Sequence, residues 1–159
     1  MSGVRAHVKD FAALVRVVQH AHGLSIFHRD ISISNIFYDK QSNEMFLNDW
    51  SSAHKRYSSA AASPVSSQED SVKWVGTPYF SCSRVDGQGN HIPTAADDLC
   101  SIVKCAQLSY CNQLLPILLE TERERFFDRE IWQVPYWRTA WDFGERCDYD
   151  SLAAHFQQL

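Results

Sequence analysis

A short polar segment that reads His28-Arg29-Asp30-Ile31-Ser32-Ile33-Ser34-Asn35 constrains this sequence more than any other feature. Asp30 carries a carboxylate that can accept a proton from a hydroxyl group. Asn35, five residues later, offers a neutral amide oxygen, which is a ligand that hard cations accept. What such a pair can do depends on the groups that the rest of the chain places beside it.

The residues after Asn35 predict a β-hairpin. The short apolar runs 36–38 and 45–47 flank a polar, turn-forming segment. Asp49 follows shortly after the second run. A hairpin of this length would return Asp49 to the side of the loop that holds Asp30, and would gather two carboxylates and an amide in one place.

Helical spacing accounts for most of the remaining ordered sequence. Apolar residues recur at alternating spacings of four and three from Val4 to His22, and Gly23 is a good terminator. Thr94 is a candidate N-cap, followed by Asp97 and Asp98 in a first turn where negative charge is favourable. The pattern predicts a single domain, 1–159, with a mainly helical α+β fold and helices over residues 4–22, 95–111, 112–130 and 149–159.

Residues 51–75 differ from the rest of the chain in composition. They contain eight serines, three consecutive alanines and one proline, and they lack helical or strand periodicity. This composition predicts a long mobile loop. Order is expected to return near Trp74, ahead of Gly76-Thr77-Pro78.

Composition excludes several classes of protein. The net charge of −4 and the scattered basic residues argue against a nucleic-acid partner. No apolar stretch approaches the ~20 residues that a membrane span requires, and the N-terminus has no apolar signal region. The five cysteines are odd in number and form no C-x-x-C pair, which favours packing roles in a reducing, intracellular location, cytoplasmic or nuclear. His20 and His22 would point different ways on a helix, so a metal site there is not expected.

Together, these motifs resemble the C-terminal lobe of the protein kinase superfamily, over roughly residues 5–111. The order His-Arg-Asp-Ile-Ser-x-x-Asn is most similar to the catalytic loop of the fungal-type protein kinases. The resemblance implies that Asp30, Arg29 and Asn35 are catalytic residues, with Asp30 as the base, and that Asn35 and Asp49 bind the Mg²⁺ of ATP. It also implies a protein substrate whose hydroxyl group receives the γ-phosphoryl group.

The resemblance implies supporting roles as well. Residues 51–75 would form the activation segment, in which Ser63 is a candidate regulatory phosphorylation site whose phosphate could pair with Arg29. His28 would be a packed residue that holds the loop. Asp98, with the spacing of an Asp-x-x-Ser motif, would anchor the loop backbone, although a plain role in the first turn of its helix explains that residue equally well.

The sequence also departs from the kinase pattern. Ser51 stands where the Asp-Phe-Gly motif has its glycine, and Asp49 in this setting also fits a plain turn or helix-cap aspartate. Residues 82–84 lack the glutamate of the Ala-Pro-Glu motif, so the salt bridge of that glutamate is not expected. Ser32 occupies the place of a lysine near the transferred phosphate and cannot supply its charge.

The upper half of an ATP site is missing from the pattern. No Gly-rich loop, strand lysine or partner glutamate precedes the first predicted helix. We therefore expect a partial kinase domain whose N-terminal lobe would come from a longer chain or a partner chain. Two other functions stay open: a catalytically inactive, pseudokinase-like interaction module, and a small-molecule phosphotransferase with a related Asp-x-x-x-x-Asn loop. The long segment 51–75 and Gly76-Thr77-Pro78, which looks like the start of a substrate-facing loop, count against the latter.

Overall fold

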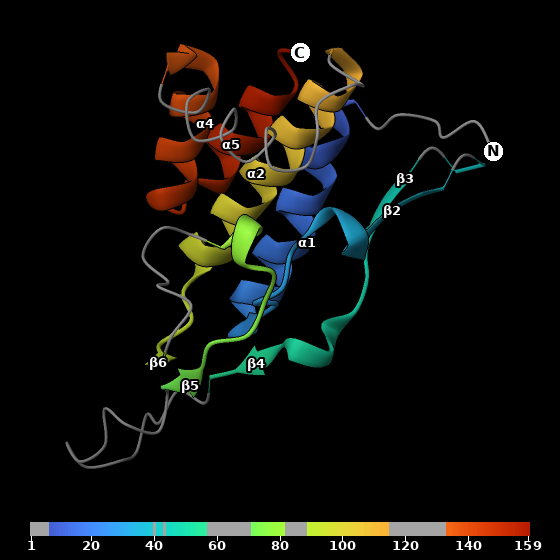
Figure 1. The fold of residues 1–159 in the computed structure, drawn as a ribbon. Coiled ribbons are helices and arrows are strands. Elements are labelled where there is room, and N and C mark those ends of the chain that lie inside the picture. Colours follow the sequence, from blue (N-terminus) through green and yellow to red (C-terminus); the bar gives the residue numbers. More distant parts are fainter. Residues whose placement is uncertain (1–6, 40, 43, 57–70, 82–88, 115–132) are drawn as a thin grey trace.

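In the part of the chain that the structure describes, four helices pack against one another, and small antiparallel sheets lie at one end and one side of them (Figure 1). The computed structural model describes residues 7–39, 41–42, 44–56, 71–81, 89–114 and 133–159. The helices are α1 (Phe11–Gly23), α2 (Ala95–Leu114), α4 (Pro135–Glu145) and α5 (Tyr149–Phe156). Helix α1 contacts α2 and α5, and α4 contacts the same two helices. The predicted mainly helical α+β class is therefore confirmed.

Helix α1 begins later than the predicted boundary at residue 4. His7 has an extended backbone, with φ −83° and ψ 155°, and its amide donates to Asp10 Oδ2 over 2.7 Å. A single 3₁₀ turn, Val8–Asp10, leads from there into α1. The His7 amide therefore donates to the Asp10 carboxylate and not to a backbone carbonyl one turn earlier, and the regular helix starts only at Phe11. The predicted end at Gly23 is confirmed.

The core lies between α1, α2 and α5. Helix α1 contributes its predicted apolar face. Helix α2 buries Leu99, Ile102, Val103 and Ala106, with Tyr110 packed against the core. Phe11 meets Phe156 of α5 edge-on, with ring centroids 6.4 Å apart. The buried apolar residues of these three helices include Phe11, Leu14, Val15, Val18, Leu99, Ile102, Val103, Ala106, Leu152 and Phe156. Trp137, Ala140 and Trp141 of α4 belong to the same core. Burying each of the larger side chains stabilises the fold by about 1.5–3 kcal/mol.

Helix α4 was not predicted from the sequence. Its buried residues Trp137, Ala140, Trp141 and Gly144 recur at helical spacing and pack on α2. Pro135 stands at its first position, where a missing N–H costs nothing. Four aromatic rings in one short helix, on both its buried and its less buried sides, obscured a spacing that is helical.

The cysteines that the structure describes in α2 behave as packing residues. Cys100 and Cys105 are fully buried in the core. Burial raises the pKa of the Cys105 thiol well above its usual value, and the thiol therefore stays protonated at neutral pH.

The predicted β-hairpin is confirmed. Strands β2 (Ile36–Asp39) and β3 (Glu44–Leu47) are antiparallel and project from the side of the helices (Figure 1). The Asp39 carboxylate accepts from the amides of Gln41 and Ser42, which sets the turn between the strands.

Two further pairs of very short strands were not predicted. Strand β1 (Ile26–Phe27) pairs with β4 (His54–Lys55), and β5 (Val72–Lys73) pairs with β6 (Asn90–His91). Two residues are too few to show a strand periodicity. Strands β4, β5 and β6 lie at the lower end of the helices in Figure 1, away from the C-terminus.

Two predicted segments fall largely outside the described residues. Of the predicted mobile loop 51–75, residues 57–70 are not described, and its two ends carry β4 and β5. Of the predicted helix 112–130, residues 112–114 form the last turn of α2, and the rest is not described before residue 133. In the described part of the chain, no helix has the length and apolarity that crossing a bilayer requires.

Two tyrosines of α4 and α5 predict a loss of stability at alkaline pH. Burial raises the pKa of Tyr136 to about 12, and burial, together with Cys147 and Asp98, raises the pKa of Tyr149 to about 12. In the unfolded chain both phenols ionise at about pH 10. Between these values unfolding releases protons that the folded chain keeps, so the free energy of unfolding should fall as the pH rises through the window.

Urea unfolding at a series of pH values checks this. A variant with Tyr136→Phe and Tyr149→Phe lacks both phenols, so its deficit in stability relative to the unaltered chain should shrink from about pH 10 to pH 12. A deficit that stays constant across the window would contradict the raised pKa values.

Candidate active site

The structure brings Asp30 and Asn35 together. A 3₁₀ turn, Ile33–Asn35, bends the chain so that Asn35 Nδ2 donates to the Asp30 carbonyl over 2.9 Å and to Asp30 Oδ2 over 3.3 Å. Because Nδ2 makes both bonds, the Asn35 amide has its oxygen as an acceptor for another group. Ser32, between them, is buried and bonds to the Ser34 hydroxyl, so it adds no charge to the site.

Asp49 returns to the side of this loop as predicted. Ile36 of β2 pairs with Leu47 of β3, and the amide of Asn48 then donates to the Asn35 carbonyl over 2.8 Å. The Asp49 carboxylate is exposed and caps a 3₁₀ turn, Trp50–Ser52, by accepting from the side chain and the amide of Ser51. These two bonds lower the pKa of Asp49, so the group is ionised at neutral pH.

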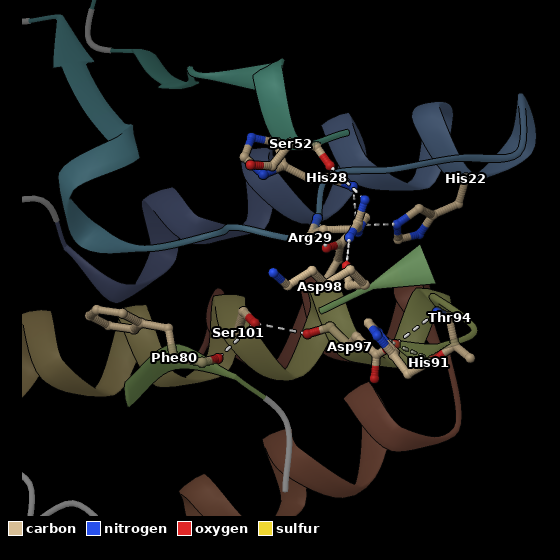
Figure 2. A network of polar contacts seen from close by, with 11 residues as sticks. His22, His28, Arg29, Ser52, Phe80, His91, Thr94, Asp97, Asp98 and Ser101 are labelled. Carbon is tan, nitrogen blue, oxygen red and sulfur yellow. Dashed lines mark hydrogen bonds and ion pairs between the residues drawn. The ribbon is translucent and has the colours of Figure 1, made fainter. Parts of the chain in front are cut away.

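Asp98 anchors the backbone of the loop (Figure 2). It lies in the first turn of α2, is fully enclosed, and accepts from the His28 amide at Oδ2 over 2.7 Å and from the Arg29 amide at Oδ1 over 2.9 Å. A first-turn residue that served only the helix dipole would face solvent near its own helix end. The geometry instead matches the anchoring role that was predicted for Asp98.

His22 completes the surroundings of Asp98. Its Nε2 lies 2.9 Å from Asp98 Oδ2, and Figure 2 shows its ring pointing toward that carboxylate. The sequence predicted that His22 would lie on the inner face of the first helix, and no role beside the loop was predicted for it. A histidine at the end of a helix, six residues before His28, is a signal that could have pointed to a role beside the loop.

His28 is a packed residue within the loop. Its side chain is fully buried and meets the Trp50 ring edge-on at 4.6 Å. His28 Nε2 lies 3.0 Å from the Asn48 carbonyl, and Nδ1 accepts from the Asp30 amide over 3.3 Å. A ring with its proton on Nε2 makes both bonds, because Nε2 then donates to the Asn48 carbonyl and Nδ1 accepts from the Asp30 amide. The His28 side chain thus connects the loop to the segment that leads to Asp49.

Arg29 connects the loop to both ends of segment 51–75. Its NH1 donates to the Ser52 carbonyl over 3.2 Å, and its NH2 donates to the Lys73 carbonyl. Burial lowers the pKa of Arg29, and the charge of Asp98 opposes that shift. Ser63 lies outside the described residues, so its pairing with Arg29 after phosphorylation stays a prediction.

Two residues of the site have strained backbones. Arg29 has φ 72° and Asp49 has φ 56°, both in the left-handed region that residues with a side chain rarely occupy. Such conformations cost about 1–3 kcal/mol each and cluster at functional sites. Arg29 directly precedes Asp30, and Asp49 follows the second strand of the hairpin.

Thr77 is the functional neighbour that the sequence did not reveal by itself. Its amide and its hydroxyl both donate to Asp30 Oδ1, each over 2.9 Å. The turn before it needs Gly76, whose φ is 134° and whose missing Cβ would lie 2.7 Å from the Arg29 carbonyl oxygen. The close approach of these two backbones brings Thr77 to Asp30, 47 residues away in the sequence.

Helix α2 holds the segment that follows Thr77. Ser101 Oγ donates to the Phe80 carbonyl over 2.7 Å, and Lys104 Nζ donates to the Ser81 carbonyl over 2.6 Å (Ser101 and Phe80 are drawn in Figure 2). Residues 82–84, where the kinase pattern has its Ala-Pro-Glu motif, lie outside the described residues. The contacts from α2 secure the chain immediately before them.

An exposed aromatic pair lies on the hairpin beside the site. Phe37 and Phe46 are cross-strand partners, and they are 53% and 49% exposed. Phe37 follows Asn35 by two residues, and Phe46 precedes Asp49 by three. The two apolar runs predicted a hairpin but not which of its faces would be left uncovered.

Metal binding by protein side chains alone is not indicated. Among the residues that the structure describes, no group of three or more His, Cys, Asp or Glu side chains could hold a metal ion. Mg²⁺ is commonly held by one or two protein oxygens together with water and substrate phosphates. The Asp49 carboxylate and the Asn35 amide oxygen are donors of that kind.

Scans of the sequence against protein-family models and against curated proteins find no match. The chemistry of the site must therefore be inferred from its own residues and their geometry.

Proposed function

We propose that the chain is the C-terminal lobe of a protein kinase of the serine/threonine type, which transfers the γ-phosphoryl group of ATP to a protein hydroxyl. The observation that carries this proposal is the placement of the Asp30 carboxylate. Thr77 and Asn35 hold it from two sides, while Asp98 holds the backbone of the loop. The loop sequence is most similar to that of the fungal-type protein kinases.

Asp30 would orient the attacking hydroxyl and accept its proton. Its Oδ1 accepts two bonds from Thr77, whereas its Oδ2 accepts a single, longer bond from Asn35. A carboxylate oxygen has two acceptor positions, so Oδ2 offers one to a substrate hydroxyl. Such positioning is most of what phosphoryl transfer asks of a protein.

Asn35 and Asp49 would hold the metal that accompanies the nucleotide. Magnesium bound to ATP neutralises charge on the phosphate oxygens during transfer. Asp49 is ionised and exposed, and the Asn35 amide is oriented by its own bonds to Asp30. Both donors are oxygen atoms, which Mg²⁺ prefers.

The strained backbones and the aromatic pair support the same function. Arg29 and Asp49 are two of the four described residues that have a side chain and a left-handed backbone, the others being Ser25 and Cys147. Phe37 and Phe46 present an apolar surface next to the metal-binding residues, on which the base of a nucleotide could rest. A second lobe, from a longer chain or from a partner, would cover this surface.

A catalytically inactive interaction module is the second candidate. The same exposed Phe37 and Phe46 favour it, since two half-exposed aromatic side chains on one hairpin also suit a protein partner. A small-molecule phosphotransferase is the third, and it would share the Asp30–Asn35 geometry. Assays with a protein and with small hydroxyl compounds as acceptors separate the third candidate from the first.

Replacing Asp30 tests the proposal directly. In the protein made from the full reading frame, Asp30→Asn should lower the rate of phosphoryl transfer by about 10²–10⁴-fold, because the amide cannot take the proton. Its affinity for MgATP, measured by calorimetry, should be unchanged. Asp49→Asn should instead weaken MgATP binding.

Asp39→Asn is the matched control, because Asp39 is an exposed carboxylate at the far end of the same hairpin. It should leave both rate and affinity unchanged. Transfer that is as fast in Asp30→Asn as in the unaltered protein would overturn the catalytic role. An unaltered protein that neither binds MgATP nor transfers phosphate would favour the interaction module.

A further inference from the structure

We propose that Tyr149, at the start of α5, is a positioning residue for the His28–Asn35 loop. Through the ring of His22 it fixes the Asp98 carboxylate, which in turn holds the loop backbone. The contacts stand by themselves, and their meaning for phosphoryl transfer rests on the proposed function.

The contacts form an unbroken chain from α5 to the loop. The Tyr149 hydroxyl lies 2.8 Å from His22 Nδ1, and His22 Nε2 lies 2.9 Å from Asp98 Oδ2. The same oxygen accepts the His28 amide over 2.7 Å. The side chains of His22 and Asp98 are only 5% and 3% exposed, so solvent cannot readily replace either contact.

The direction of each bond follows from the groups involved. The Asp98 carboxylate already accepts two backbone amides, and it can only accept from His22 as well. In the neutral ring Nε2 therefore carries the proton, and Nδ1 is left as an acceptor. The Tyr149 hydroxyl is its donor. The raised pKa of Tyr149, about 12, means that the phenol keeps this proton at neutral pH.

Besides its two hydrogen bonds, the ring of His22 makes contacts with two aromatic rings. Phe27 stacks on it with centroids 5.2 Å apart, and Tyr149 itself packs at 5.8 Å. Without the hydroxyl, Nδ1 would be a buried acceptor with no donor, which costs about 1–3 kcal/mol. The ring would then be free to turn away from Asp98.

Tyr149 is well placed to act as a fixed point. Asp148 caps α5 by accepting from the Ser151 amide over 3.1 Å, and Asp150 pairs with Arg16 of α1. The far end of α5 packs on the core through Phe156. A helix fixed at both ends thus carries the hydroxyl that orients His22.

Amide exchange in the chain 1–159 tests the proposal without any need for catalysis. In Tyr149→Phe the His28 and Arg29 amides, which donate to Asp98, should exchange about tenfold faster relative to core amides of α1. Tyr136→Phe is the matched control: its hydroxyl donates to the His155 carbonyl in the same helical region and its pKa is also about 12. That variant should leave the two loop amides unchanged.

Nitrogen chemical shifts of His22 give a second measurement that needs no variant. The unaltered chain should show the tautomer with its proton on Nε2, and Tyr149→Phe should show this signature lost or mixed. A proton on Nδ1 in the unaltered chain would overturn the proposal, even if Tyr149→Phe failed to fold. Loop amides unaffected by Tyr149→Phe, or affected equally by Tyr136→Phe, would overturn it as well.

Kinetics separate this proposal from the proposed function. In an active full-length protein, Tyr149→Phe should lower kcat about three- to tenfold with the KM for ATP unchanged, since the loop and not the nucleotide site is disturbed. If the unaltered protein shows no transfer, the proposed function fails while the exchange and tautomer results still decide the role of Tyr149. If transfer occurs and the loop amides do not respond, only the role of Tyr149 fails.

Discussion

Asp98→Asn should lower the free energy of unfolding by about 3–5 kcal/mol, as expected when one partner of a buried, charged hydrogen-bond network is removed. Three donors converge on the Asp98 carboxylate: the amides of His28 and Arg29 and the ring of His22. Asparagine offers one acceptor oxygen, and its NH₂ group would face a donor. At least one buried N–H is then left without a partner. Urea unfolding measures the loss.

Asp97→Asn is the control for this prediction. Asp97 is the preceding residue of the same first turn, and its carboxylate accepts from the amide and hydroxyl of Thr94 in a more exposed position. Both variants remove one negative charge near the N-terminus of α2, so they lose the same favourable interaction with the helix dipole. Asp97→Asn should cost about 1 kcal/mol. Equal losses in the two variants would mean that Asp98 is merely a first-turn residue.

Asp98→Asn should also change the geometry of the site around Asp30. Arg29 holds a left-handed backbone with φ 72°, which costs about 1–3 kcal/mol and persists only while neighbouring contacts enforce it. The bond from its amide to Asp98 is one of those contacts. Once it is lost, Arg29 can relax, and Asp30, the next residue, moves with it.

The regular elements could be predicted because their side chains repeat at a fixed period. The apolar face of α1, from Phe11 to Val18, is visible in the sequence, and so is that of α2 from Leu99 onward. The hairpin followed from two apolar runs around a polar turn. These signals are local, so one sequence is enough to read them.

The contacts that assemble the site are not local, and this is why most of them were missed. Thr77 reaches Asp30 across 47 residues, and Tyr149 reaches His22 across 127. No periodicity relates such pairs, and a tyrosine that begins a short helix looks like any other core residue. For Asp98 the resemblance to kinases offered the anchoring role, but its position in a first turn fitted a simpler role equally well.

The Asp30 carboxylate is the point at which these distant contacts meet. Asp98 fixes the backbone before it, Asn35 bonds to it from the next turn, and Thr77 bonds to it from beyond segment 51–75. Each contact comes from a different part of the chain. In the proposed reaction, a carboxylate held in this way would be oriented before the substrate arrives, and such positioning lowers a reaction barrier.

Gly76→Ala should have the second large effect, because glycine is required there for two independent reasons. Its φ of 134° is a conformation that residues with a side chain rarely adopt, and an added Cβ would lie 2.7 Å from the Arg29 carbonyl oxygen. The dihedral strain costs about 1–3 kcal/mol and the overlap about 1–3 kcal/mol more. We expect a loss of about 2–6 kcal/mol in the free energy of unfolding. The Thr77 amide, which donates to Asp30, should also exchange faster.

Substitutions at two other glycines separate the effect of the dihedral strain from the effect of the steric overlap. Gly89 has φ 95° but no atom within 4 Å of an added Cβ, so Gly89→Ala should show the dihedral strain alone. Gly23, at the end of α1, has an open surrounding, and Gly23→Ala should change stability by less than about 1 kcal/mol. If Gly76→Ala costs no more than Gly89→Ala, the close approach to Arg29 is not what fixes this turn. If it costs more and the Thr77 amide loses its protection, the contact between the two backbones is what delivers Thr77 to Asp30.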